Sequence, residues 1–163
     1  AACSRRVRAH IASGYSIRQA DVDLSHNAVS DAGFRSILRA WSKLGLDCPL
    51  VLKAHFNLLT DAALVALAGF ARSYPGQLRE VHLTNNAFRE REAVIGLLLS
   101  FVGLPQYPMW VRRQRRHAPV YLRLGNCGIA RPEELLEEAA AGSLRWCLMQ
   151  DGGCSKTLCA QAG

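Results

Sequence analysis

The sequence predicts an α/β protein in which short strands and helices alternate along a repeated unit. Three segments, 22–32, 52–62 and 81–88, share one pattern, and their aligned asparagines, Asn27, Asn57 and Asn86, are 30 and 29 residues apart. Each segment begins with strand-like alternation, and apolar residues at helical spacing follow it. Such units bury their apolar faces on their neighbours, so the repetition predicts a parallel sheet with helices on one side, built as a solenoid.

The alternation within each segment defines the predicted strands. In the first unit Val22 and Leu24 point to one side of the strand, while Asp23 and Ser25 point to the other. Each predicted helix then carries one apolar face, which in the first unit consists of Phe34, Ile37, Leu38, Trp41 and Leu44. Equivalent faces recur within 64–71 and 94–101. Ser30 and Thr60, each followed by Asp, are the expected N-caps of the first two helices.

A fourth unit covers residues 122–129, with Cys127 in place of the asparagine. About a dozen extra residues separate it from the third unit, and insertions in repeat arrays map to loops on one face. A partial fifth unit is expected at 144–148 as a cap. The predicted organisation is a basic leader or cap at 1–20, a repeat domain at 21–148 with an insertion at 104–119, and a Cys/Gly-rich tail at 149–163.

The units resemble leucine-rich repeats, whose pattern is L-x-x-L-x-L-x-x-N/C-x-L. The third unit matches best, with Leu78, Val81, Leu83, Asn86 and Phe88. The period, with a full helix in each unit, is similar to that of the ribonuclease-inhibitor-like class. Other units depart from the first leucine position, which is occupied by Gln19, Pro49 and Pro119. The resemblance implies a short horseshoe with parallel strands on the concave face and helices on the convex face.

The repeated asparagine has a structural explanation. The chain turns sharply after each strand and leaves backbone groups unpaired inside the corner. An amide side chain both donates and accepts, so stacked copies could satisfy these groups as a ladder. Cys is small and tolerates burial, so it can fill the same corner. The predicted structural ladder consists of Asn27, Asn57, Asn86 and Cys127.

Charge is concentrated in two stretches rather than spread over the chain. The 20 Lys and Arg residues exceed the 13 Asp and Glu residues by seven, and arginines at 5, 6 and 8 and in the insertion account for the excess. The insertion sets these arginines beside aromatic rings, which could hold a nucleic-acid strand or an acidic protein surface. Its polyanion-binding candidates are Trp110, Arg112, Arg113, Arg115 and Arg116. The alternative is a solvated loop in which Tyr107 and Trp110 pack on the solenoid.

The sequence indicates no catalysis. It has no nucleophile elbow, phosphate-binding loop, zinc-protease motif or dinucleotide fingerprint, so we expect neither an enzyme nor a cofactor. His26, His55 and His82 occupy different positions in their repeats, and the cysteine spacings do not match zinc sites, so no metal site is predicted. No apolar run is long enough to cross a membrane. The six cysteines are interpreted as free thiols of an intracellular protein, cytoplasmic or nuclear.

The predicted function is non-catalytic binding of another protein by the outward positions of the strands. Phe56 would be the aromatic anchor of a polar interface. Two alternatives stay open: an RNA- or DNA-associated module that uses the Arg-rich insertion, and a regulatory or targeting domain of a larger enzyme, since the chain lacks an initiator Met. The partner-binding candidates are Asp23, Ser25, His26, Lys53, His55, Phe56, His82, Thr84, Asn85, Arg123 and Asn126.

Overall fold

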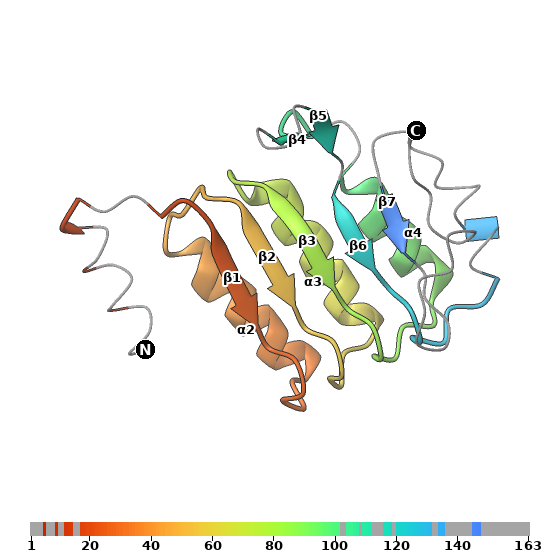
Figure 1. The fold of residues 1–163 in the computed structure, drawn as a ribbon. Coiled ribbons are helices and arrows are strands. Elements are labelled where there is room, and N and C mark those ends of the chain that lie inside the picture. The colour runs from red at the N-terminus through yellow and green to blue at the C-terminus, as the bar shows by residue number, and fades with distance from the viewer. Residues whose placement is uncertain are drawn as a thin grey trace.

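The protein is α/β, with a parallel sheet covered by helices on one face (Figure 1). The structure, a computed structural model, describes residues 17–101, 104–107, 120–131 and 134–135, the backbone of 109–111, 116–118 and 145–147, and residues 5, 9 and 12–14 near the N-terminus. The predicted leader and the tail at 149–163 therefore lie largely or wholly outside the described residues. Within the described part of the chain, no helix combines the length and the apolar character needed to cross a bilayer.

Strands and helices alternate in the predicted order. The sheet strands are β1 (Ala20–Asp23), β2 (Leu50–Lys53), β3 (Leu78–His82), β6 (Tyr121–Arg123) and β7 (Arg145–Cys147), and they lie side by side in that order. Every neighbouring pair is parallel. The helices are α2 (Asp31–Ser42), α3 (Asp61–Ser73) and α4 (Arg91–Leu99). Strand β7 lies within 144–148, where a partial fifth unit was expected as a cap.

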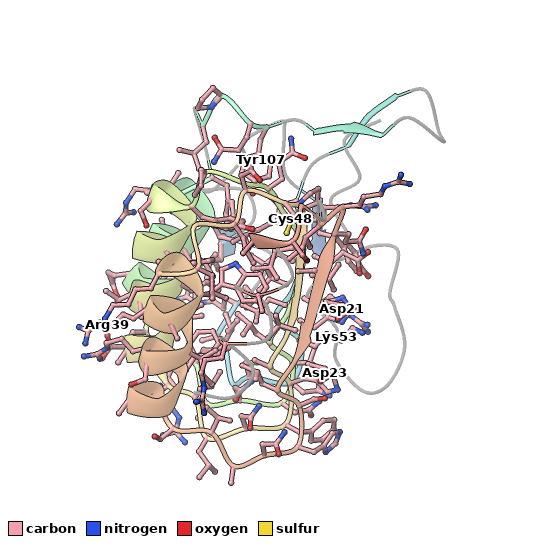
Figure 2. All side chains as sticks on the ribbon, turned by 90° about the vertical axis from the view of Figure 1, so that its left-hand side faces the viewer. Asp21, Asp23, Arg39, Cys48, Lys53 and Tyr107 are labelled. Carbon is pink, nitrogen blue, oxygen red and sulfur yellow. The ribbon has the colours of Figure 1, made fainter. Side chains whose placement is uncertain are left out.

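Two layers result from this order. Figure 1 shows α2, α3 and α4 behind the sheet, and the view in Figure 2 shows helices on one side of the strands only. The core lies between the layers because strand and helix residues that point inward are buried there. Phe34, Leu64 and Leu97 on the three helices are fully buried, as the predicted apolar faces require.

The strand register confirms the predicted alternation. Val22, Leu52, Val81 and Leu122 are paired across the four strands as one inward row. Leu52, Val81 and Leu122 are at most 1 % exposed, and Val22 is partly buried because β1 ends the described sheet. A shift of one residue would turn these side chains to the opposite face, so burial of the row fixes the register.

One irregularity was not predicted. Leu50 pairs with Leu78 and Val51 with Glu80, so β3 holds Arg79 as an extra residue, a β-bulge. The Arg79 guanidinium donates a hydrogen bond of 2.8 Å to Gln19, beside β1. This bond crosses β2. Val51 of β2 is only 5 % exposed, although it comes just before the inward-facing Leu52 and so points to the opposite side of the strand.

The asparagines form the hydrogen bonds predicted for the ladder. The Asn57 Oδ1 accepts from the backbone N–H groups of Asn27 and Val29, and its Nδ2 donates to the carbonyls of Leu24 and Ala54. The bonds to Asn27, Val29 and Leu24 reach the preceding unit, so one side chain closes its own corner and joins it to its neighbour.

The other ladder positions repeat this arrangement with fewer hydrogen bonds than Asn57 forms. Asn86 accepts from the Leu59 N–H and donates to the Ala54 and Leu83 carbonyls. The Cys127 thiol, buried, lies 3.2 Å from the Leu83 carbonyl and donates to it. Asn27 differs: it is exposed, and its side-chain amide donates within its own corner, to the Ser25 carbonyl. Its position on the edge of the described sheet explains the difference, since no earlier strand of that sheet lies beside β1.

Carboxylates form a second link between units. Ser30 caps α2 as predicted, accepting from the Gly33 N–H. Thr60 precedes α3 but makes no side-chain cap; its hydroxyl and its N–H both donate to Asp31 of the preceding unit. Asp61 likewise accepts from the backbone N–H groups at 89 and 90. These aspartates thus bridge the starts of successive units rather than only their own helices.

The insertion contains a hairpin that was not predicted. Strands β4 (Met109–Val111) and β5 (Arg116–Ala118) pair antiparallel, so the expectation of a loop was wrong for these residues. Tyr107 packs on the repeats: its hydroxyl accepts from the Leu78 N–H at 2.7 Å, and its ring lies edge-on to Phe101. Burial raises the pKa of this phenol.

A core truncation tests the register. We expect Leu83→Ala to lower the free energy of unfolding by about 2–5 kcal/mol, because Leu83 is 1 % exposed. Urea unfolding measures the loss. Leu58→Ala is the matched control, since Leu58 is 63 % exposed, and it should change stability by less than about 0.5 kcal/mol. Equal effects of the two substitutions would contradict the register.

The ladder can be tested at two of its positions. Asn57→Ala leaves several corner N–H and carbonyl groups unpaired, so we expect a loss of about 3 kcal/mol in the same measurement. Asn27→Ala removes a single bond at an exposed site and should cost less than about 1 kcal/mol. Similar losses for both variants would show that the bonds to the preceding unit contribute nothing.

Candidate functional site

The face of the sheet opposite the helices, here called the strand face, carries the outward side chains. Asp23, Lys53, His82 and Arg123 are paired across β1, β2, β3 and β6 as one outward row. Figure 2 shows Asp21, Asp23 and Lys53 pointing away from the helices, whereas Arg39 lies on the helix side. Four of the eleven predicted residues therefore face outward from the strands, and the other seven follow the strand ends.

The strand face extends into the turns that follow the strands. His26, Phe56, Asn85 and Asn126, each just before a ladder position, all have positive φ, between 52° and 58°. In the first three of these turns the N–H of that residue donates to a carbonyl of the next unit, as from His26 to His55. The left-handed conformation is thus a repeated feature of the corner, and each unit presents one such side chain beside its strand.

A hollow of about 350 Å³ opens on the strand face between the turns of β2, β3 and β6. Seven of the predicted partner-binding residues line it, and they come from three successive units. The lining consists of His55, Phe56, His82, Thr84, Asn85, Arg123 and Asn126. None of the seven is acidic. Residues up to 71 positions apart in sequence, from His55 to Asn126, are thereby brought to one site.

The other four predicted residues lie beside the hollow, toward β1. The His26 ring stacks on Phe56, with ring centroids 4.5 Å apart and planes 16° apart, and His55 meets His26 edge-on at 5.4 Å. The Lys53 ammonium forms an ion pair of 3.3 Å with Asp21. All eleven candidates therefore belong to one continuous surface, with an aromatic cluster at the border of the hollow.

Asp23 is held in its charged form. The Ser25 hydroxyl and N–H both donate to its carboxylate, and these hydrogen bonds, with the charges of Lys53 and His55, lower the pKa of Asp23. Ser25 therefore orients the carboxylate at the β1 end of the strand face rather than offering its own hydroxyl outward.

The two imidazoles that line the hollow, His55 and His82, favour the neutral form. Burial lowers the pKa of His55, and Asp23 opposes this shift. His26, Arg123 and Lys53 lower the pKa further. Burial also lowers the pKa of His82, and Arg123 adds to this effect, although Glu80 accepts a 3.2 Å bond from the ring and opposes it. The Arg123 charge thus acts on both imidazoles, and all three side chains line the same hollow.

Three residues of the strand face were missed in the sequence. Asp21 pairs with Lys53, Glu80 pairs with His82, and the Tyr121 ring lies edge-on to His82 at 6.0 Å. Each lies two residues before a predicted outward residue, so the period of a strand was the signal that could have found it.

The polyanion-binding candidates are placed only in part. Trp110 pairs with His117, and Arg116 with Val111, in the backbone of the hairpin. Their side chains, and Arg112, Arg113 and Arg115 altogether, lie outside the described residues. The hypothesis that the insertion binds nucleic acid stays a prediction.

Among the described residues, no group of three or more His, Cys, Asp or Glu side chains is arranged to hold a metal ion. His26 and His55 lie close together, but His82 faces Tyr121 and Glu80 instead. Cys48 and Cys127 are buried free thiols, and burial raises the pKa of both. These thiols are suited to packing and not to nucleophilic attack.

The lowered pKa values predict a loss of stability on mild acidification. Since His55 and His82 have folded-state pKa values below the ordinary 6.5, the unfolded chain takes up their protons first. The free energy of unfolding should therefore fall as the pH drops from about 7.5 to about 5.5. Urea unfolding at both values measures this. A double variant, His55→Gln with His82→Gln, should flatten the dependence, and an unchanged slope would contradict the assignment.

The comparisons add no relative. The chain matches no protein-family model, no curated protein and no solved structure at a significant level. The role of the strand face is therefore argued from its own geometry: the row of outward side chains, the hollow and the aromatic cluster beside it.

Proposed function

We propose that the chain is a short leucine-rich-repeat solenoid whose strand face binds another protein without catalysis. Several observations support the fold: parallel strands that recur with the repeat, side chains that join successive corners, and a left-handed residue before each ladder position. In such a fold the strands form the inner surface and present outward side chains from several units to one partner.

The observation that carries the binding proposal is Phe56 at the border of the hollow. Its side chain is 49 % exposed although it is a large aromatic. Its φ is 52°, a conformation that costs a bulky residue about 1–2 kcal/mol and that asparagine tolerates better. The third and fourth units have Asn85 and Asn126 at the same place. An exposed ring kept at such a position is better explained by contact with a partner than by stability.

Binding without catalysis fits the chemistry of the hollow. Its lining offers one hydroxyl, two amides, two imidazoles, a guanidinium and a phenyl ring, with no thiol and no carboxylic acid among the seven residues. Such a mixture of one aromatic anchor and a hydrogen-bonding surround is typical of a polar protein interface. The partner would lie across several units rather than within one of them.

Replacing Phe56 with asparagine tests the proposal with little risk to the fold. Phe56→Asn removes the ring and supplies a residue suited to the left-handed corner. We expect the free energy of unfolding to stay within about 1 kcal/mol of the wild type or to rise. Recovery of the partner in affinity purification from cells should fall by about tenfold or more, as for an interface anchor.

Val65→Gln is the matched control, because Val65 is an exposed apolar residue on α3, on the helix side. It should leave partner recovery unchanged. If Val65→Gln lost the partner and Phe56→Asn kept it, the interface would be on the helices. If Phe56→Asn unfolded the chain, Phe56 would be a structural residue and not an anchor.

A further inference from the structure

We propose that the hollow receives the carboxylate of an Asp or Glu side chain from the partner, with an apolar side chain of the same segment lying on Phe56. This inference rests on the proposed function, since it assigns the chemistry that the strand face recognises. It follows from three observations: the charge of the lining, the charges that surround it, and the aromatic cluster at its border.

The lining is suited to an anion. Arg123 supplies the one permanent positive charge among its seven residues, and none of them is acidic. Thr84, Asn85 and Asn126 lie around the same hollow and provide hydroxyl and amide N–H groups that can donate to oxygen. A carboxylate with two oxygens can accept from a guanidinium and from neighbouring amides together.

The surroundings favour one carboxylate over a chain of phosphates. Asp21, Asp23 and Glu80 lie on the strand face, on which the hollow also opens. They would repel the repeated charges of a nucleic-acid strand, whose binding depends on many cations at once. Lys53 is already paired with Asp21. A single carboxylate at Arg123, at the far end of the row from Asp23, stays away from the two aspartates of β1.

The border of the hollow supplies the apolar contact. Phe56 belongs to the lining and also stacks with His26, so its ring joins the hollow to the aromatic cluster. A segment whose carboxylate reaches Arg123 would therefore lay a neighbouring side chain on this ring. The recognised feature is an acidic residue close in sequence to an apolar or aromatic one.

Labelled peptides test the inference directly. The probes are fluorescein-labelled octapeptides of Gly and Ser with one Trp and one Glu, separated by one to four residues, and matched peptides with Gln or Lys in place of Glu. Fluorescence anisotropy measures their binding to the full chain. We expect the Glu peptide of at least one spacing to bind about tenfold more tightly than its Gln counterpart, as for a charge-assisted hydrogen bond. Arg123→Gln should abolish this preference, and Arg123→Lys should keep part of it.

Arg131→Gln is the control, since Arg131 is exposed and pairs with Glu134 away from the hollow. It should leave the preference intact. Equal binding of Glu and Gln peptides at every spacing, or no binding of any peptide, would overturn the inference. So would displacement of the Glu peptide by a 12-nucleotide single-stranded RNA at equal concentration, which would indicate phosphate recognition instead.

The two proposals fail differently. If Glu and Gln peptides bind equally but Phe56→Asn weakens both, the strand face binds peptides and only the carboxylate assignment is wrong. If Phe56→Asn changes neither the peptides nor recovery of the cellular partner, the proposed function fails as well. Thermal unfolding of the Arg123 variants, compared with Arg131→Gln, separates a lost contact from a lost fold.

Discussion

The hydrogen bonds made by Asn57 and Asn86 at the ends of β2 and β3 are the constraint on which the rest of the structure depends. A chain that leaves a strand and turns back toward a helix buries N–H and carbonyl groups that no strand can pair. One amide side chain donates and accepts, so it satisfies groups of its own corner and of the unit before it. The same contacts that prevent unpaired backbone groups therefore also set the distance between successive units. Cys127 continues only the donating half, with its bond to the Leu83 carbonyl.

This corner also determines what the strand face can present. Closing the turn places the preceding residue in the left-handed region in all four units, at His26, Phe56, Asn85 and Asn126. For asparagine that conformation costs little, so Asn85 and Asn126 agree with local structure and with the fold. Phe56 does not, yet its ring stacks on His26 at 4.5 Å and is 49 % exposed. A conflict between local preference and the fold, kept at an exposed position, is the usual mark of a functional residue.

The features that follow from the strand and repeat periods could be predicted from the sequence. The bulge and the hairpin, which depart from these periods, could not. Alternation in strands such as 22–25 identified the inward row and most of the outward one, because burial of one face requires it. The repeat then brought seven of the eleven candidates to one hollow, although the hollow itself is formed by three units together. The bulge at Arg79 was missed because a polar residue there fits a regular strand equally well. Strands β4 and β5 were missed because Pro108 and Pro119 flank them and their arginines carry no strand signal.

The charge of the chain and the charge of the strand face differ, and the difference favours a protein partner. The excess of seven positive charges lies in the leader and the insertion, whereas the strand face holds Asp21, Asp23 and Glu80 beside Lys53, Arg79 and Arg123. These groups are also ordered: the aspartates lie on β1 and Arg123 on β6, three strand spacings or about 14 Å apart. A polyanion gains nothing from such an arrangement, because one end repels it. A protein segment with charges of both signs would bind in one orientation, with its acidic side chain at Arg123 and its basic side chain at Asp23.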